Sequence, residues 1–323
     1  MRRGQRGAAL LAAMLTVTLV ATFAASALWQ QWRAIELETA ERARLQAAWI
    51  LVGALDWSRL VLREDGRAGD ADHLAEPWAV PLQEARLSTF LAAERNVAQQ
   101  EDASTDTTDA FLSGRIIDLQ SRLNLANLVD GNEISASSLR QFRRLFERLG
   151  LPVQQLNALA EALRLARSTA AADGQAALAP PTLSQLGWLG LPPATLALLE
   201  PHVTLLPVRT PLNLNTAGAE VLAAAIEGLD AAGAQKLVQS RATRHFRQIT
   251  EARDLLGAGV DINTNEHSVT TSYFEVRGQL RLGPLRMGER SLVRRQGREV
   301  TTLWREQGLF ERAPATPAAE PLR

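Results

Sequence analysis

An uninterrupted apolar segment near the N-terminus constrains this chain more than any other feature. Residues 8–29 carry no charge and follow a short leader that contains Arg2, Arg3 and Arg6. Roughly 20 apolar residues are enough to cross a bilayer as an α-helix. Because basic flanks stay in the cytoplasm, the segment predicts a single span that sends everything after residue 33 across the membrane.

A cleaved export signal also begins with basic and then apolar residues, and Ala25-Ser26-Ala27 offers a small-x-small cleavage sequence. The helical pattern continues past it, however, since neither Gly nor Pro occurs between Ala8 and Val52. One helix of about 45 residues, roughly 65 Å long, is expected. Its second half should pack on a domain through one face, formed by Leu45, Ala48, Trp49, Val52 and Leu55. An ordinary anchor and a cleaved signal are the alternatives.

Composition limits the chemistry. The 323 residues contain 35 basic and 35 acidic side chains and no cysteine. The balanced charge gives no general affinity for polyanions. Without cysteine, disulfides, thiol catalysis and cysteine metal sites are excluded. Nor does the sequence contain a nucleophile elbow, a Gly-rich phosphate loop or an HExxH motif, so no enzyme is predicted.

Helical and extended patterns alternate in the middle of the chain. Residues 82–98 are expected to be helical, 99–109 to form an exposed loop, and 111–119 to form a strand. Three segments then share a pattern of helix, Gly-containing turn and helix, which predicts a repeated helical unit. These are residues 145–163, 183–199 and 221–238, with a linker at 168–181.

From residue 269 the apolar period becomes two, as expected for strands. Residues 291–295 and 299–304 predict a hairpin across Gln296-Gly297. Strands before and after the helical block should therefore share one sheet. The expected fold class is α+β, with a long N-terminal helix packed on a small antiparallel sheet and a large, mainly helical inserted domain.

The N-terminus resembles that of type IV pilins and of the pseudopilins of type II secretion, in which a short basic leader ends in Gly before a retained apolar helix. The matching residues are Arg6-Gly7 followed by Ala8-Ala9-Leu10-Leu11. Further matches are similar to the K-type minor pseudopilin, the general secretion pathway protein K family. They are Gly114-Arg115-Ile116-Ile117-Asp118, Leu123-Asn124-Leu125-Ala126-Asn127-Leu128, Val203-Thr204-Leu205-Leu206-Pro207, Leu212-Asn213-Leu214-Asn215-Thr216-Ala217 and Leu303-Trp304-Arg305. Ala126 departs from the family, which usually has Asn there.

The resemblance implies a role and a place. The chain would be a minor pseudopilin in the inner membrane, with a cytoplasmic N-terminus and most of its residues in the periplasm. It would assemble with the I- and J-type minor pseudopilins at the pseudopilus tip, support export of folded proteins across the outer membrane, and require no cofactor. The implied parts are a leader at 1–7, a pilin-like helix at 8–60, α/β segments at 61–123 and 266–310, a helical insertion at 124–265 and a disordered tail at 311–323.

Two positions at the N-terminus follow from the same resemblance. Prepilin peptidase would cut between Gly7 and Ala8. Most pilin-like subunits carry Glu at the fifth mature position, where it pairs with the α-amine of the preceding subunit. Here that position is Ala12, and residues 8–32 contain no acid. A non-acidic fifth residue is expected to place the chain at the tip.

Candidate ion sites are weak. Calcium prefers carboxylate oxygens, and many pseudopilins bind it, but a solvated acidic loop is the simpler interpretation of Glu101, Asp102, Asp106 and Asp109. Asp254, Asp261, Asn263 and Asn265 form an equally weak second set. The histidines at 73, 202, 245 and 267 have no metal-ligand spacing.

The Asn-rich segments also resemble the entry to helix-hairpin-helix DNA-binding repeats. Nearby basic side chains could meet phosphates, namely Arg241, Arg244, His245 and Arg247. The hairpin, however, reads Glu227-Gly228-Leu229-Asp230 and lacks the Gly-hydrophobic-Gly turn. We therefore interpret the polar residues as turn and cap formers: Asn124, Asn127, Asn213, Asn215 and Thr216. No nucleic acid is expected, and a membrane-anchored DNA-binding protein of a competence or type IV pilus system is the alternative function.

Overall fold

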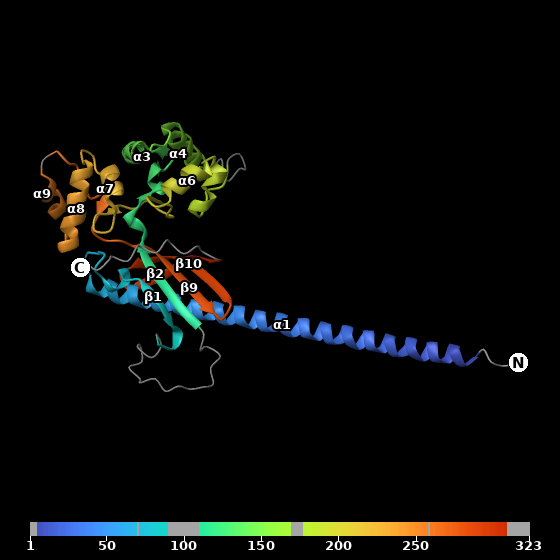
Figure 1. The fold of residues 1–323 in the computed structure, drawn as a ribbon. Helices are drawn as coiled ribbons and strands as arrows, with labels where there is room; N and C mark the ends of the chain where they lie inside the picture. The colour runs from blue at the N-terminus through green and yellow to red at the C-terminus, as the bar shows by residue number, and fades with distance from the viewer. Residues whose placement is uncertain (1–4, 70, 90–109, 169–176, 258, 309–323) are drawn as a thin grey trace, which may run out of the picture.

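A single long helix dominates the shape of the molecule (Figure 1). The computed structural model describes residues 5–69, 71–89, 110–168, 177–257 and 259–308. Helix α1 (Gln5–Ala68) is 64 residues long, and its N-terminal part stands clear of everything else. Within the described chain, Ala8–Arg67 is the one helix that is long and apolar enough to cross a membrane. The helix thus continues well past the possible signal cleavage sequence.

Five antiparallel strands form the sheet that packs on the second half of α1. Their order is β1 (Leu82–Arg86), β2 (Ala110–Asp118), β9 (Tyr273–Leu282), β10 (Leu285–Gln296) and β11 (Glu299–Gly308). Strand β2, before the helical block, pairs directly with β9 behind it. The predicted shared sheet and the predicted β10–β11 hairpin are both confirmed, and so is the α+β fold class.

The prediction of a helix over residues 82–98 was wrong at its start, where β1 lies. Only Leu87 to Thr89 are helical, and residues 90–98 lie outside the described chain. Strand β1 hydrogen-bonds to β2 with a register shift between Leu82 and Ala85. Pairing with a neighbouring strand overrides local propensity, and here it covers the edge that β2 would otherwise expose.

The face of α1 that meets the sheet agrees with the prediction at Leu55 and differs from it elsewhere. The buried positions step by three and four residues, as a helix face requires: Ala47, Leu51, Leu55, Ser58 and Leu62. Leu45 and Trp49 are instead 62% and 72% exposed. Each lies two residues from a buried position, which is about 200° around a helix of ~3.6 residues per turn, so they point to the opposite side.

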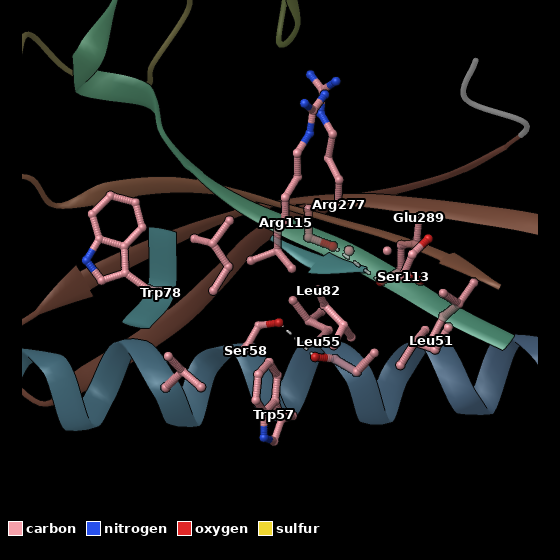
Figure 2. A pocket seen from close by; sticks show the side chains of 18 of the residues that line it. Leu51, Leu55, Trp57, Ser58, Trp78, Leu82, Ser113, Arg115, Arg277 and Glu289 are labelled. Atoms are coloured by element: carbon pink, nitrogen blue, oxygen red, sulfur yellow. Dashed lines mark hydrogen bonds between the residues drawn. The ribbon is translucent and has the colours of Figure 1, made fainter. Parts of the chain in front are cut away.

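Two glycines that pair across β2 and β9 allow close packing: Gly278 lets α1 approach the sheet, and Gly114 lies tight against the backbone of β9. A Cβ on Gly278 would lie 3.2 Å from Cδ2 of Leu51, and a Cβ on Gly114 would lie 2.8 Å from the carbonyl oxygen of Arg277. These contacts are tighter than ordinary packing distances. Beside them an apolar groove runs between α1 and the edge of the sheet, lined by Leu51, Leu55, Trp57, Trp78 and Leu82 (Figure 2).

The helical block lies between β2 and β9 in the chain and has its own core of leucine and alanine. The three predicted helix–turn–helix segments are present, with positive-φ glycines at 150, 190 and 228 in their turns. In the second segment the first helix is a 3-10 helix. The elements are α3 (Ala136–Arg148), α4 (Val153–Arg167), η4 (Leu183–Leu189), α6 (Pro193–Leu199), α7 (Ala219–Ala225), α8 (Ala231–Thr243) and α9 (Ile249–Leu256).

Short elements complete the fold. The two-residue strands pair as β3 (Leu123–Asn124) with β6 (Val203–Thr204), β4 (Val129–Asp130) with β5 (Glu133–Ile134), and β7 (Leu212–Asn213) with β8 (His267–Ser268). Single 3-10 turns are η1 (Pro77–Ala79), η2 (Leu119–Ser121) and η3 (Leu125–Leu128). The β3–β6 and β7–β8 pairs lie where the chain enters and leaves the helical block. The predicted tail at 311–323 lies outside the described residues.

Candidate functional site: the joint between sheet and helical block

One buried carboxylate joins the end of β2 to the helical block. Asp118 is 3% exposed. Its oxygens accept hydrogen bonds from the backbone N–H of Gln120 at 2.7 Å and from the amide of Asn213 at 3.0 Å. The hydroxyls of Thr216 and Thr271 donate at 2.6 and 2.7 Å. Four donors from three separate stretches of chain therefore meet on one side chain.

Within the described part of the chain, Asp118 is held by hydrogen bonds and not by a cationic side chain. Burial raises the pKa of Asp118 from its ordinary 3.8 to about 6, because the loss of solvent outweighs the lowering by the hydrogen bonds from Thr216, Thr271, Gln120 and Asn213. Hydrogen bonds to the charged form hold it in place without neutralising it.

A second buried group, on the same side of the joint, is an ion triplet. The Arg295 guanidinium on β10 contacts the carboxylates of Asp65 and Asp72, and both acids are at most 9% exposed at the side chain. Asp72 also accepts from the N–H of Thr271 at 2.6 Å. Burial raises the pKa of Asp72, and Arg295 opposes that shift. The triplet thus ties the end of α1, through Asp65, and the segment after it, through Asp72, to strand β10.

The acids of this triplet are also the one group of three potential metal ligands within the described ranges, together with Glu76. Glu76 accepts from the N–H of His73 at 2.8 Å and from the indole N–H of Trp78 at 2.7 Å. Burial raises its pKa to about 7. The Arg295 guanidinium already contacts Asp65 and Asp72. These two acids are therefore paired with an arginine side chain, which takes the place that a metal ion would need.

The five polar residues predicted as turn and cap formers do two different jobs. Asn124 accepts the N–H of Ala126 at 3.0 Å, and Asn213 accepts that of Asn215 at 3.0 Å, as expected of such residues. Both also donate to distant parts of the chain, Asn124 to the carbonyl of Val208 at 2.8 Å and Asn213 to that of Asp72 at 3.1 Å. The other three make long-range bonds as well. Asn127 bonds both the N–H and the carbonyl of Thr210, Asn215 does the same to Phe246, and Thr216 donates to Asp118.

Three of the four basic residues considered for phosphate binding have side-chain contacts within the protein. Arg241 donates to the carbonyl of Leu214, and burial lowers its pKa to about 10. Arg244 lies 3.6 Å from Glu251. The ring of His245 stacks on that of His73, with centroids 3.8 Å apart, and so links the helical block to the sheet domain. Arg247 is exposed, and its backbone N–H donates to the carboxylate of Glu251 at 3.0 Å.

Gly228, in the helix–turn–helix hairpin, allows close packing of two backbone segments. A Cβ on Gly228 would lie 2.4 Å from the carbonyl oxygen of Gly259, so the position is closed by backbone. Glu227 beside it lies 3.6 and 3.9 Å from Arg140 and Arg144. The turn therefore presents an ion-paired acid where a phosphate would need free amides.

The remaining predicted ligands are dispersed or outside the described chain. Residues 101–109, with the first calcium set, are not described. In the second set, Asn263 accepts the N–H of Asn265 and of Glu266 at 3.1 Å, which closes a local turn, and Asp261 pairs in an isolated bridge with Glu227. His267 is buried, which lowers its pKa, and its Nε2 has no hydrogen-bond partner.

Comparison with known proteins places this architecture. Family models described as type II secretion system protein K match residues 121–208 and 212–270. Type II secretion system protein K of Pseudomonas aeruginosa is 31% identical over 314 residues, which covers 88% of this chain and 87% of the relative. The chain belongs to the protein K family of type II secretion systems. It is therefore a minor pseudopilin, and the DNA-binding alternative is not favoured.

A solved structure agrees on the fold. One chain in the crystal structure of the GspK–GspI–GspJ complex from the type 2 secretion system of enterotoxigenic Escherichia coli matches with a TM-score of 0.64 and 20% identity. The match covers 84% of this chain and 99% of that one. For this protein K family member, the buried joint around Asp118 sets how the helical block is held on the pseudopilin domain.

Proposed function

We propose that this minor pseudopilin assembles with I- and J-type subunits at the tip of the pseudopilus and supports export of folded proteins across the outer membrane. The observation that carries the proposal is α1, whose N-terminal half is apolar, exposed and free of acids from residue 8 to 32. Such a helix needs lipid or other helices around it. The related complex contains GspI and GspJ subunits beside GspK.

The tip position rests on charge. An α-amine buried in an apolar helix bundle is costly unless an acid meets it. Ala12 cannot provide that acid to a subunit beyond this one. The α-amine of this chain can still pair with an acid of the subunit added below. A position with no subunit above it satisfies both conditions, and the bulky helical block fits the same place because a shaft site offers little lateral room.

Substitution Ala12→Glu tests the tip position. We expect secretion to be unchanged or mildly reduced, because no subunit amine lies above to be paired. Stoichiometry measured by quantitative mass spectrometry of purified complexes should remain one copy per complex. Site-specific crosslinks that join copies of this chain to one another along the shaft would contradict the assignment.

Processing by prepilin peptidase is proposed between Gly7 and Ala8, on the cytoplasmic face of the inner membrane. A side chain at residue 7 would crowd the cleavage site, so Gly7→Val should leave nearly all of the protein as precursor in the membrane. N-terminal sequencing of the mature wild type should give a sequence that begins at Ala8. The matched control, Gly4→Val, should still be cleaved. A mature start near Ser26 or Trp29 would mean conventional export instead.

The proposed function involves no enzymatic activity and requires no cofactor, and calcium binding is compatible with it but not needed. Its direct test is co-purification of the full-length protein with its own I- and J-type subunits from membranes. A one-to-one-to-one complex supports the proposal. Failure to recover either subunit, together with salt-sensitive duplex DNA binding in the micromolar range that is lost in an Arg241/Arg244/Arg247→Ala triple variant, would favour the DNA-binding alternative.

A further inference from the structure

The sheet face turned away from α1 carries an unusual set of arginines. Strand register places paired residues on the same side of a sheet. Arg115 pairs with Arg277, Arg277 with Arg290, Arg281 with Arg286, and Arg294 with Tyr273. Figure 2 shows Arg115 and Arg277 side by side, both pointing away from the helix. We call this surface the arginine face: Arg86, Arg115, Arg277, Arg281, Arg286, Arg290 and Arg294.

The arginine face is strongly basic although the whole chain is neutral. Four acids contact or share it, and they are Glu84, Glu275, Glu299 and Glu306. Seven arginines against four acids leave a formal charge of 7 − 4 = +3 on this face among the described residues. Arg277 and burial both lower the pKa of Arg115, with burial the larger cause. Like charges are thus held together there.

Aromatic rings fix the positions of these side chains. The guanidinium carbon of Arg281 lies 4.0 Å from the ring centre of Phe111. That of Arg290 lies 5.6 Å from the Trp304 ring, and that of Arg294 lies 6.0 Å from the Tyr273 ring. A guanidinium held over a ring keeps its N–H groups at its edges, where they can donate in pairs to a carboxylate.

Part of the face is already covered by the helical block. Leu206 packs with Tyr273 and Leu292 in a small buried cluster at the end of the sheet nearest the block. The other end stays open. There Arg286 is exposed, and Arg277, Arg281 and Arg290 are half-buried.

The arginine face points perpendicular to the axis of α1 and not along that axis toward the membrane. The sheet packs flat along α1, so the arginine face lies roughly parallel to the helix axis (Figure 1). About 17 helical residues separate the end of the apolar segment from the first buried position, Ala47, which at ~1.5 Å per residue is about 25 Å. The headgroups of the bilayer that holds α1 are therefore out of reach.

We propose that the arginine face binds an acidic patch on a folded protein that approaches the assembled tip from its outer side. The outward placement rests on the proposed function, because helices that bundle through the exposed side of α1 turn the opposite sheet face outward. A protein surface fits better than a polyanion. Glu275, Glu306 and Glu84 are interspersed among the arginines, and they would repel the continuous negative charge of a phosphate chain but tolerate a mixed protein surface.

The test uses the full-length protein in detergent and, as the carboxylate probe, a peptide of about 20 residues in which glutamates alternate with serines, so that its negative charge is not continuous. A triple variant, Arg281→Glu/Arg286→Glu/Arg290→Glu, should weaken binding at least about tenfold, and wild-type binding should weaken as salt is raised. The matched control, Arg143→Glu/Arg247→Glu/Arg298→Glu, makes the same change in charge at exposed positions elsewhere and should change binding less than about twofold. Because Glu could disturb folding, a triple Arg→Gln variant with an unchanged melting temperature should show the same loss.

Two further measurements can overturn the proposal. Inorganic polyphosphate and phosphatidylglycerol vesicles are titrated in parallel, and tighter binding of either, with the same loss in the triple variant, would assign the face to phosphates. The triple Arg→Glu variant should also still co-purify with I- and J-type subunits. Its loss from the complex would make the face a contact within the tip. If the wild type itself fails to co-purify, the proposed function fails, whereas the peptide titration still decides the chemistry of the face.

Discussion

Arg295→Ala should lower the free energy of unfolding by about 3 to 5 kcal/mol at pH 7, because it leaves two buried carboxylates without their cation. Asp65 and Asp72 both contact this guanidinium, and the side chain of Asp72 is only 2% exposed. Chemical denaturation of the full chain in detergent, followed by tryptophan fluorescence, measures the loss. Arg298→Ala, on the exposed turn of the same hairpin, is the control and should change little.

Charge and packing can be separated at this position. Arg295→Met keeps an apolar stem of similar length, so it should be nearly as destabilising as alanine if the unpaired acids cause the loss. Adding Asp72→Asn to Arg295→Met should then recover part of the stability. The loss should also shrink toward pH 4, since the pKa of Asp72 is raised further without Arg295 and protonation removes the buried charge. A methionine variant as stable as wild type would contradict this account.

The second large effect is expected at Asp118. Asp118→Ala removes the acceptor for Gln120, Asn213, Thr216 and Thr271, and should cost about 2 to 4 kcal/mol because buried donors lose their partners. Limited proteolysis should then cut near residues 205–211 or 269–272, where the block is tied to the sheet. Asp130→Ala, at an exposed ion pair with Arg209, is the matched control.

The cost of Asp118→Ala should depend on pH with a defined sign. The folded-state pKa, about 6, lies above the ordinary 3.8, so folding favours the protonated acid. The stability that Asp118 contributes is therefore fully present below about pH 4 and falls as the pH rises through about 6. The difference between wild type and variant should accordingly be larger at pH 4 than at pH 7.5. The opposite trend would mean that the hydrogen bonds lower the pKa of Asp118 more than burial raises it.

Much of this architecture could be predicted from local patterns. The apolar segment, the helix–turn–helix repeats and the β10–β11 hairpin each have a sequence period that one segment shows by itself. Strand β1 could not be predicted that way, because its five residues are extended only through pairing with β2. The packing face of α1 was predicted correctly at Leu55 but wrongly at Leu45 and Trp49, since these two are as apolar as the positions that are buried.

The joint could not be predicted because its partners are distant in sequence. Asp118 bonds to residues 95, 98 and 153 positions later, and Asp72 pairs with Arg295 across 223 positions. A signal for Asp118 was present, since a lone acid ends the apolar strand at Ile116-Ile117. The asparagines were noticed because their segments are rich in this residue. Which of their hydrogen bonds are local and which are long-range follows only from the three-dimensional structure.

The pairing of β2 with β9 has a consequence for how the chain reaches its folded state. Asp118 and Phe274 lie opposite each other in neighbouring strands although more than 150 residues separate them. Closing so large a loop from an unfolded chain would be slow. The helical block has its own core, and its entry and exit are held together by β7, β8 and the joint. A block that folds first brings the two strands side by side, so the insertion acts as an internal template for the sheet that it interrupts.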